Sequence, residues 1–185
     1  MSNKQLCFIA LLPPPIVQAE ANAIKDHFAT AYESSHAKNS PPHITLQPPF
    51  KWNKNELSHL KTTLRDFSHC QPAIPVTLSG FGAFPPRVIY IHVEKTPELL
   101  KIQSSLLVYL EQQLGLVDSI AQSRPFVPHM TVAFRDLSKA NFHQAWQFYK
   151  QQPFEYQFTV NELTLLLHNG KFWEIEETFS FSPNI

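Results

Sequence analysis

One short phrase occurs twice in this chain, and it constrains the fold more than any other feature. A proline, a histidine, an apolar residue, a threonine and a second apolar residue follow one another at 42–46 (PHITL) and again at 128–132 (PHMTV). In both halves the phrase stands at the same place in a longer order of strand-like and helix-like stretches. We interpret this order as an internal duplication and expect two similar lobes.

The first half is expected to run strand, helix, strand, helix, strand. The expected strands are 5–12, 43–47 and 73–81. The first helix has roughly helical spacing of the apolar residues Ile16, Ile24, Phe28 and Tyr32. Asn53 is expected to cap the second helix, whose apolar stripe is Leu57, Leu60, Leu64 and Phe67.

The second half repeats this order and adds a hairpin. Its expected strands are 88–93, 129–134, 154–160 and 162–168. Thr96-Pro97 should open a helix that Gly115 ends, and Ser138 should cap the next one. The last strand, 171–179, should follow a turn at Asn169-Gly170.

These elements predict an α+β fold with two lobes. We expect a bilobal duplicated fold in which two antiparallel β-sheets face a central cleft, with helices outside and a pseudo-twofold axis between the lobes. The lobes should pack intimately into one domain, 1–185, with the first motif at 43–46 and the second at 129–132. The only candidate hinge is the stiff segment GAFPPR at 82–87.

Charge and hydropathy restrict the partners. Fifteen basic residues balance 15 acidic ones, which argues against a long run of phosphate contacts but leaves room for a small or end-bound anion. The apolar run near the start of the chain, LCFIALL, is too short to span a bilayer. We therefore expect a cytoplasmic monomer with no membrane partner and no targeting segment.

The repeated phrase predicts a shared polar surface. Side chains alternate across a strand, so His43 and Thr45 lie on one face and Ile44 on the other. His129 and Thr131 have the same relationship in the second half. If a pseudo-twofold axis relates the lobes, two imidazoles and two hydroxyls surround one cleft.

That set of groups fits proton transfer around a phosphate. Two histidines with an ordinary pKa of about 6.5 can act as base and acid on opposite sides of one reacting centre. The threonine hydroxyls can donate to phosphate oxygens as charge develops there. Neither a metal nor another cofactor is required, and the remaining histidines lack the spacing of metal ligands.

The two motifs, HITL at 43–46 and HMTV at 129–132, resemble the signature of the 2H phosphoesterase superfamily. The longer words around them are similar to those of its 2′-5′ RNA ligase family, also described as RNA 2′,3′-cyclic phosphodiesterases: PPHITLQPPF, FGAFPPRVIYIHV and RPFVPHMTVAF. The resemblance covers essentially the whole chain. It implies a bilobal fold and metal-independent opening of a 2′,3′-cyclic phosphate to a 2′-phosphate, with reversible 2′-5′ RNA ligation as a linked activity.

The resemblance also implies residue roles. His43 and His129 supply the acid and the base, and we assign the base to His129 and the acid to His43, although pseudo-symmetry makes the two alike. Thr45 and Thr131 hold the phosphate. An arginine near the second motif suits phosphate, and Arg124 is the candidate. Two further candidates for the lining of the cleft are Tyr90 and His92.

The sequence also allows other interpretations. Each histidine taken alone could be a strand-end residue satisfied by the backbone, and Arg124 could be an ordinary loop residue. The whole chain could be a non-catalytic module that binds RNA ends or nucleotides, although a binder has no need for two proton carriers. The expected substrates are RNA 2′,3′-cyclic phosphate ends, small cyclic nucleotides or ADP-ribose cyclic phosphate. DNA is excluded because it lacks the ribose 2′-oxygen.

Overall fold

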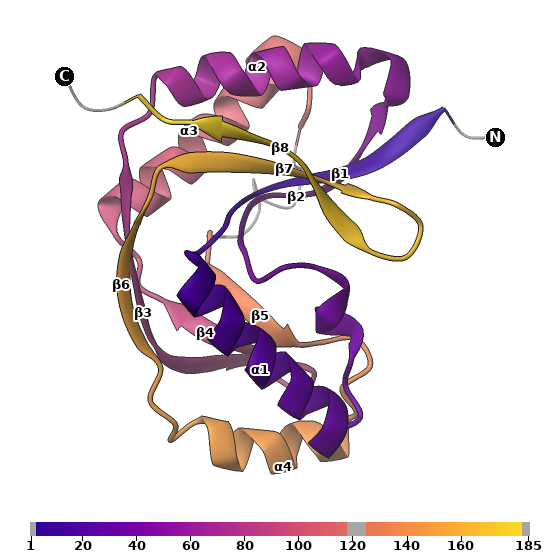
Figure 1. Cartoon of the computed structure of the whole chain (residues 1–185), viewed down its shortest axis with the longest axis vertical. Coiled ribbons are helices and arrows are strands. Elements are labelled where there is room, and N and C mark those ends of the chain that lie inside the picture. Colours follow the sequence, from indigo (N-terminus) through magenta and orange to yellow (C-terminus); the bar gives the residue numbers. More distant parts are fainter. Residues whose placement is uncertain (1–2, 118–124, 183–185) are drawn as a thin grey trace.

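A computed structural model describes residues 3–117 and 125–182 of the chain (Figure 1). The strands are β1 Lys4–Leu11, β2 Ile44–Asn53, β3 Ile74–Phe84, β4 Val88–Val93, β5 His129–Ala133, β6 Glu155–Val160, β7 Glu162–His168 and β8 Trp173–Ser180. The α-helices are α1 Pro15–Ala31, α2 Leu57–His69, α3 Pro97–Leu114 and α4 Lys139–Tyr149. Two short 3₁₀ helices are η1 His36–Asn39 and η2 Lys54–Glu56. No helix in these two ranges is long and apolar enough to cross a bilayer.

The strands form two four-stranded sheets, ordered β2-β1-β7-β8 and β5-β4-β3-β6. Every pairing is antiparallel. In each sheet the strand that carries the repeated motif is an edge strand beside the first strand of its own half. The predicted α+β class, with two antiparallel sheets in a duplicated arrangement, is confirmed.

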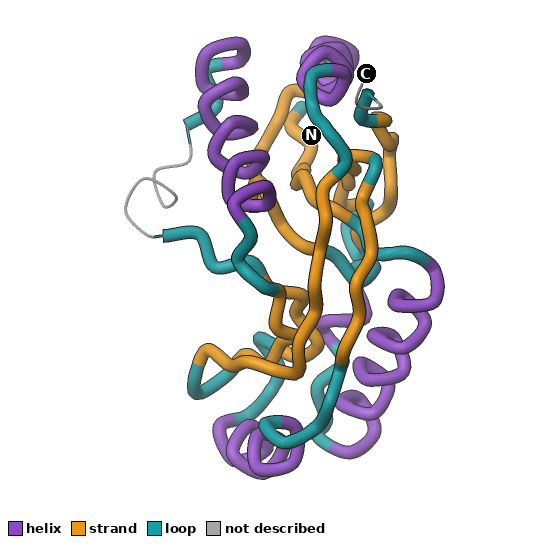
Figure 2. The backbone as a smooth tube through the Cα atoms, turned by 90° about the vertical axis from the view of Figure 1, so that its left-hand side faces the viewer, coloured by secondary structure: helices purple, strands orange, loops and turns teal. Residues whose placement is uncertain are grey.

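The two lobes exchange strands, which the simple repeat did not predict. Strand β3 belongs to the first half of the sequence but pairs with β4 and β6 in the second sheet, whereas β7 and β8 complete the first sheet. Strands β3 and β6 run together from one half of the molecule to the other (Figures 1 and 2). The short turn at 85–87 explains the exchange, because strands joined by so few residues pair with each other. The predicted hinge at 82–87 is therefore wrong: the segment is a hairpin within one sheet.

Local capping signals place most helix ends. Thr96 accepts a hydrogen bond from the Leu99 amide at 3.2 Å, and Gly115 ends α3 with a left-handed φ of 64°. Ser138 caps α4 by accepting from the Asn141 amide. Asn53 does not cap α2 as predicted: β2 extends to this residue, its side chain caps η2 instead, and α2 begins at Leu57.

Helix α1 buries only part of the predicted stripe: Phe28 and Tyr32 belong to the core, and Ile24 packs against it. Ile16 is 62% exposed, and the four side chains of α1 that are buried are Val17, Ala21, Lys25 and Phe28. These four residues have regular helical spacing, but a lysine in the third position hides the pattern from a reading of apolar residues alone. A charged side chain is thus part of the packed face of α1.

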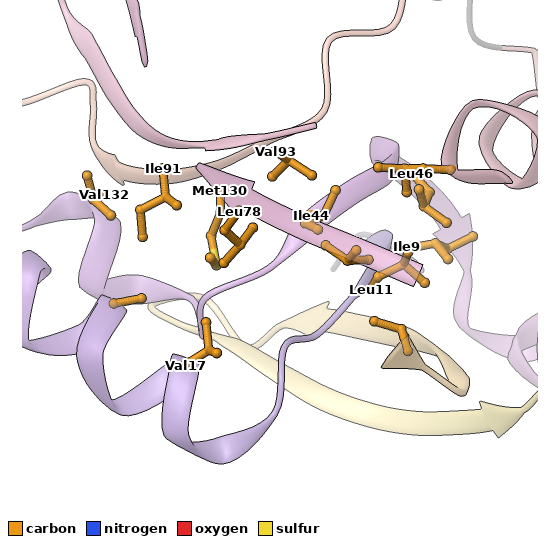
Figure 3. Close-up of a cluster of buried hydrophobic side chains, with 14 of the residues drawn as sticks. Ile9, Leu11, Val17, Ile44, Leu46, Leu78, Ile91, Val93, Met130 and Val132 are labelled. Atoms are coloured by element: carbon orange, nitrogen blue, oxygen red, sulfur yellow. The ribbon is translucent and has the colours of Figure 1, made fainter. Parts of the chain in front are cut away.

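One hydrophobic core joins both sheets. The apolar residues of the two motif strands, Ile44 and Leu46 on β2 and Met130 and Val132 on β5, are at most 1% exposed and belong to the same cluster (Figure 3). Buried residues of all four α-helices and of the other strands belong to the same cluster, and Figure 3 labels those of β1, β3, β4 and α1. Because the apolar sides of both motif strands are fixed in this core, the polar sides are held rigidly in the opposite direction.

Candidate functional site

The repeated motifs have the alternation that their sequence predicts. His43 and Thr45 are half-buried, whereas the residues between and after them are fully buried. His129 and Thr131 follow the same pattern on β5. We refer to His43, Thr45, His129 and Thr131 as the candidate site.

The fold brings the two motifs close to one another. The edge strands β2 and β5 are in contact, although they belong to different sheets. The two histidines are near enough for a positive charge on His129 to contribute to lowering the pKa of His43. This proximity comes from the packing of the lobes, because the residues are far apart in the chain.

Both imidazole rings are fixed by the same local hydrogen bond. Nδ1 of His43 lies 2.7 Å from the carbonyl oxygen of Pro41, and Nδ1 of His129 lies 2.7 Å from that of Val127. A carbonyl oxygen can only accept, so Nδ1 carries the proton and donates it in each ring. Nε2 is therefore the atom left for chemistry: it has a lone pair in the neutral ring and a proton in the imidazolium.

The proline of each motif helps to explain this geometry. Pro42 and Pro128 stand immediately before the histidines, and a residue that precedes proline favours an extended backbone. Pro41 and Val127 occupy those positions, and their carbonyls are the acceptors. The repeated Pro-His pair thus fixes the orientation of the imidazole ring in each motif.

Burial lowers the pKa of both histidines. Desolvation is the main cause for His43, whose pKa falls to about 4, with further lowering by the charges of Lys25 and His129 against the opposing hydrogen bond to Pro41. Desolvation also lowers the pKa of His129, again opposed by its backbone hydrogen bond. Both rings are consequently neutral at pH 7 in the ligand-free protein.

The two threonine hydroxyls are available for a ligand. Thr45 is the register partner of Ala10 on β1, and Thr131 is the register partner of Tyr90 on β4. Within the part of the chain that the structure describes, neither hydroxyl has a hydrogen-bond partner. Each hydroxyl can therefore donate to an anion.

Aromatic rings flank both histidines. Phe8 lies 4.7 Å from the His43 ring between centroids, and Tyr90 lies 5.2 Å from the His129 ring. Phe84 meets His129 edge-on at 5.1 Å. These aromatic neighbours exclude water from the two histidines and explain why desolvation is the main cause of both pKa shifts.

The structure places the two secondary candidates of β4 differently. Tyr90 is 7% exposed, and its ring crosses Gly82 so closely that a Cβ there would lie 2.3 Å from a ring carbon. His92 is the register partner of His129, is partly exposed and lies 3.8 Å from a carboxylate oxygen of Glu94. Both residues therefore adjoin the second motif, and Tyr90 touches its histidine.

One predicted residue, Arg124, and one unpredicted residue, Lys25, stand apart from the others. Arg124 lies outside the described residues. Lys25, which the sequence reasoning missed, is 1% exposed and acts electrostatically on His43. The available signal was a lysine at a position where the helical repeat of α1 calls for an apolar residue.

The donor set of the site does not resemble a metal centre. Among residues 3–117 and 125–182, no group of three or more His, Cys, Asp or Glu side chains could hold a metal ion. The candidate site itself offers imidazole nitrogens and hydroxyls, without the third strong ligand that a structural or catalytic zinc requires.

A family model for the 2′-5′ RNA ligase superfamily matches residues 13–171, which include both motifs and the strands from β2 to β7. The chain belongs to this superfamily. The resemblance read from the two motifs is thereby confirmed.

Relatives within the superfamily cover nearly the whole chain. A protein of Geobacillus thermodenitrificans named "Putative phosphoesterase" is 31% identical over 178 residues, covering 92% of this chain and 93% of that protein. A similarly named protein of Bacillus cytotoxicus is 29% identical over 174 residues, covering 92% and 94%. Membership of this superfamily of phosphoesterases and RNA ligases supports an enzyme.

Solved structures show the same fold at lower identity. Ligand-free LigT of E. coli superimposes with a TM-score of 0.70 at 21% identity, covering 98% of this chain and 99% of LigT. TT0787 of Thermus thermophilus has a TM-score of 0.68 at 20% identity, covering 98% and 100%. LigT has also been solved with 3′-AMP and with NADP⁺.

Proposed function

We propose that this superfamily member is a metal-independent cyclic phosphodiesterase that opens 2′,3′-cyclic phosphates to 2′-phosphates by acid–base catalysis. The observation that carries the proposal is the matched pair of histidines. His43 immediately precedes the edge strand β2 and His129 begins the edge strand β5. Each donates Nδ1–H to a backbone carbonyl, and each keeps Nε2 for proton transfer. A site built only for binding needs no such pair.

In the proposed reaction, one histidine activates water and the other protonates the leaving oxygen. His129 Nε2 accepts a proton from water as the water oxygen bonds to phosphorus. The bond between phosphorus and O3′ breaks, and His43 donates its Nε2 proton to O3′. The products are a 2′-phosphate monoester and a free 3′-hydroxyl, and proton exchange with solvent restores both rings.

The lowered pKa values of both rings are compatible with these roles. The imidazolium with the lower pKa is the stronger acid, and His43 is lowered to about 4. Desolvation also lowers the pKa of His129, which keeps this ring neutral and able to accept a proton near pH 7. A bound phosphate anion raises both pKa values, which increases the fraction of protein in which His43 holds its proton.

Thr45 and Thr131 complete the proposed machinery. Their hydroxyls donate to the two non-bridging oxygens, where charge builds as water attacks. Tyr90 holds the His129 ring by contact, and His92 and Arg124 are proposed to contact the substrate near the second motif.

We propose nucleotides with a ribose 2′-oxygen as substrates, either RNA ends or small cyclic nucleotides. The LigT structures with 3′-AMP and NADP⁺ support nucleotide-type ligands for this fold. The zero formal charge of the chain favours recognition of one phosphate over a long phosphate track. Reversible 2′-5′ ligation, a role in RNA processing, a cytoplasmic location and a monomeric state remain part of the same hypothesis.

A substrate panel tests the proposal. Purified protein in EDTA would be incubated with 2′,3′-cyclic mononucleotides, RNA oligomers ending in a cyclic phosphate, and ADP-ribose cyclic phosphate. ³¹P NMR then identifies the product as a 2′- or a 3′-phosphate. Turnover of at least one compound to a 2′-phosphate is expected, whereas tight binding without turnover would favour the non-catalytic module.

A further inference from the structure

Lys25 is a charged residue at a buried position where the fold requires no charge. Among the described residues it is the only Lys, Arg, Asp or Glu in the buried class, and it is 1% exposed. It occupies the packed face of α1 between Ala21 and Phe28. A methionine there would fill similar space without the cost of burying an ammonium group.

The hydrogen bond of Lys25 leads directly to the first motif. Its Nζ donates to the carbonyl oxygen of Ser40 at 2.9 Å. Ser40 precedes Pro41, whose own carbonyl accepts the Nδ1 proton of His43. Lys25 therefore ties helix α1 to the short segment that orients the His43 ring.

The surroundings of Lys25 contain few groups that could compensate its charge. Helix α1 packs against η1 and β5. Of the titratable groups on these elements, Lys38 of η1 forms an exposed ion pair with Asp26, and His36 lies against Arg135. The titratable group on which the charge of Lys25 acts is His43, and the charge of His129 on β5 acts on the same ring.

The second lobe has no matching lysine. Helices α1 and α3 both begin with a proline, Pro15 and Pro97, which aligns them at their first residues. Leu107 then takes the position of Lys25. The duplication is therefore not exact at this position. A lysine contributes to lowering the pKa of His43 but not that of His129.

We propose that Lys25 is a positioning residue for His43, that it acts through the Ser40 carbonyl and through its charge, and that it makes the two histidines of the duplicated site unequal. Burial excludes a role as a nucleophile, because a substrate cannot reach Nζ. The consequence for catalysis rests on the proposed function, but the effect on His43 does not.

The pKa directions agree with this role. Burial lowers the pKa of Lys25 to about 7, so the ammonium is charged throughout the range in which His43 titrates. A positive neighbour disfavours the imidazolium. Removing the lysine should thus raise the pKa of His43 and leave that of His129 less affected.

The first experiment needs no substrate. Imidazole resonances of the full chain would be followed by NMR as a function of pH in the wild type, Lys25→Met, Lys25→Arg and Lys38→Met. Lys25→Met should shift the pKa of His43 upward by on the order of one unit. Lys25→Arg should bring the pKa of His43 part of the way back to its wild-type value, and the exposed control Lys38→Met should leave this pKa unchanged. Identical His43 titrations in the wild type and Lys25→Met would overturn the proposal.

Activity provides the second readout. Lys25→Met should lower kcat on a cyclic phosphate by on the order of 10-fold, with little change in KM, because a displaced ring harms the reaction more than binding. In a His43→Ala background, Lys25→Met should cause no further loss of kcat. If the NMR shift is found but no variant, the wild type included, turns over a cyclic phosphate, the proposed function fails and the assignment of Lys25 stands.

A measurement on the wild type covers the case in which Lys25→Met does not fold. The ¹³Cε resonance of Lys25 should titrate near pH 7, and the carbonyl resonance of Ser40 should change with the same midpoint. A Lys25 titration near 10.5, the ordinary lysine value, would show a solvated ammonium and would overturn the proposal.

Discussion

His43 and His129 make the same hydrogen bond at the start of the edge strands β2 and β5, each from Nδ1 to the carbonyl two residues earlier at 2.7 Å. The match means that both rings have one tautomer when neutral and present the same atom, Nε2, to a ligand. A pair arranged in this way can exchange the roles of acid and base between forward and reverse reactions. That property suits the proposed opening of a cyclic phosphate by water and the reversible 2′-5′ ligation proposed with it.

Loss of either histidine should remove most of the activity. His43→Ala and His129→Ala should each lower kcat by about 10²–10⁴-fold, the usual contribution of a general acid or base. The double variant should lose far less than the product of the two effects, because the residues act as a unit. Initial rates on a cyclic-phosphate RNA oligomer measure this, with the exposed His59→Ala as control. Full activity in the double variant would refute the mechanism.

A better leaving group should separate the two roles. In an analogue whose 3′-oxygen is replaced by sulfur, the thiolate leaves without protonation, so the general acid becomes unnecessary. His43→Ala should regain most of the wild-type rate on this analogue, whereas His129→Ala should stay impaired. The opposite pattern would assign the base to His43.

The pH dependence should be bell-shaped, with its optimum on the acid side of neutrality. The reaction needs one protonated and one neutral histidine, and kcat/KM reports the free protein. The pKa of His43 is lowered to about 4 and that of His129 is lowered from 6.5, so the singly protonated pair is most abundant below pH 6.5. The optimum of kcat should be higher, because bound phosphate raises both values. A kcat/KM profile still rising above pH 7 would contradict the assignment, and loss of activity in EDTA would contradict metal independence.

The close approach of Tyr90 to Gly82 should make Gly82→Ala harmful. An added Cβ would lie 2.3 Å from the Tyr90 ring, which must then move away from its contact with His129. We expect a loss of about 1–3 kcal/mol in the free energy of unfolding, the usual cost of overpacking, together with reduced kcat. Urea unfolding and initial rates measure both effects. In a Tyr90→Ala background, Gly82→Ala should cause little further loss in the free energy of unfolding. An equal loss there would show that the contact with Tyr90 is not the cause.

The sequence predicted the candidate site better than the path of the chain. The two histidines and two threonines are readable because a period of two places them on one side of each motif strand and buries Ile44 and Met130 on the other. The position of β3 is not readable from the repeat, because a turn of three residues at 85–87 outweighs the duplicated order and pairs β3 with β4.

Tertiary contacts account for the features that pattern reasoning missed. The stripe of α1 was only partly predicted because Lys25 interrupts its apolar spacing, and only packing against η1 and β5 shows that the lysine is inside. The proximity of Tyr90 to Gly82 also depends on neighbouring strands, which a linear pattern cannot show. Both departures from local rules adjoin the candidate site, where a cost in stability is most often retained for function.

Removal of Lys25 should stabilise the protein at neutral pH while it impairs the site. The pKa of this lysine is about 7 in the folded chain and about 10.5 when solvated. The unfolded chain therefore binds more protons between these values, and the stability of the wild type rises with pH across that window. Below pH 7 the full penalty of the buried charge is present. Lys25→Met lacks the group, so it should be more stable than the wild type by on the order of 1–4 kcal/mol at pH 6–7, with the difference shrinking towards pH 10.

Urea unfolding of the wild type, Lys25→Met and the exposed control Lys38→Met at several pH values measures this difference. The comparison between variants isolates Lys25, because all other titrating groups are common to them. The control should follow the wild type within a few tenths of a kcal/mol, since an exposed ion pair contributes little. A Lys25→Met protein that is less stable than the wild type at pH 6 would mean that the hydrogen bond to Ser40 outweighs the burial of the charge. A more stable but slower variant would show that the chain retains this ammonium for the geometry and charge it provides at His43.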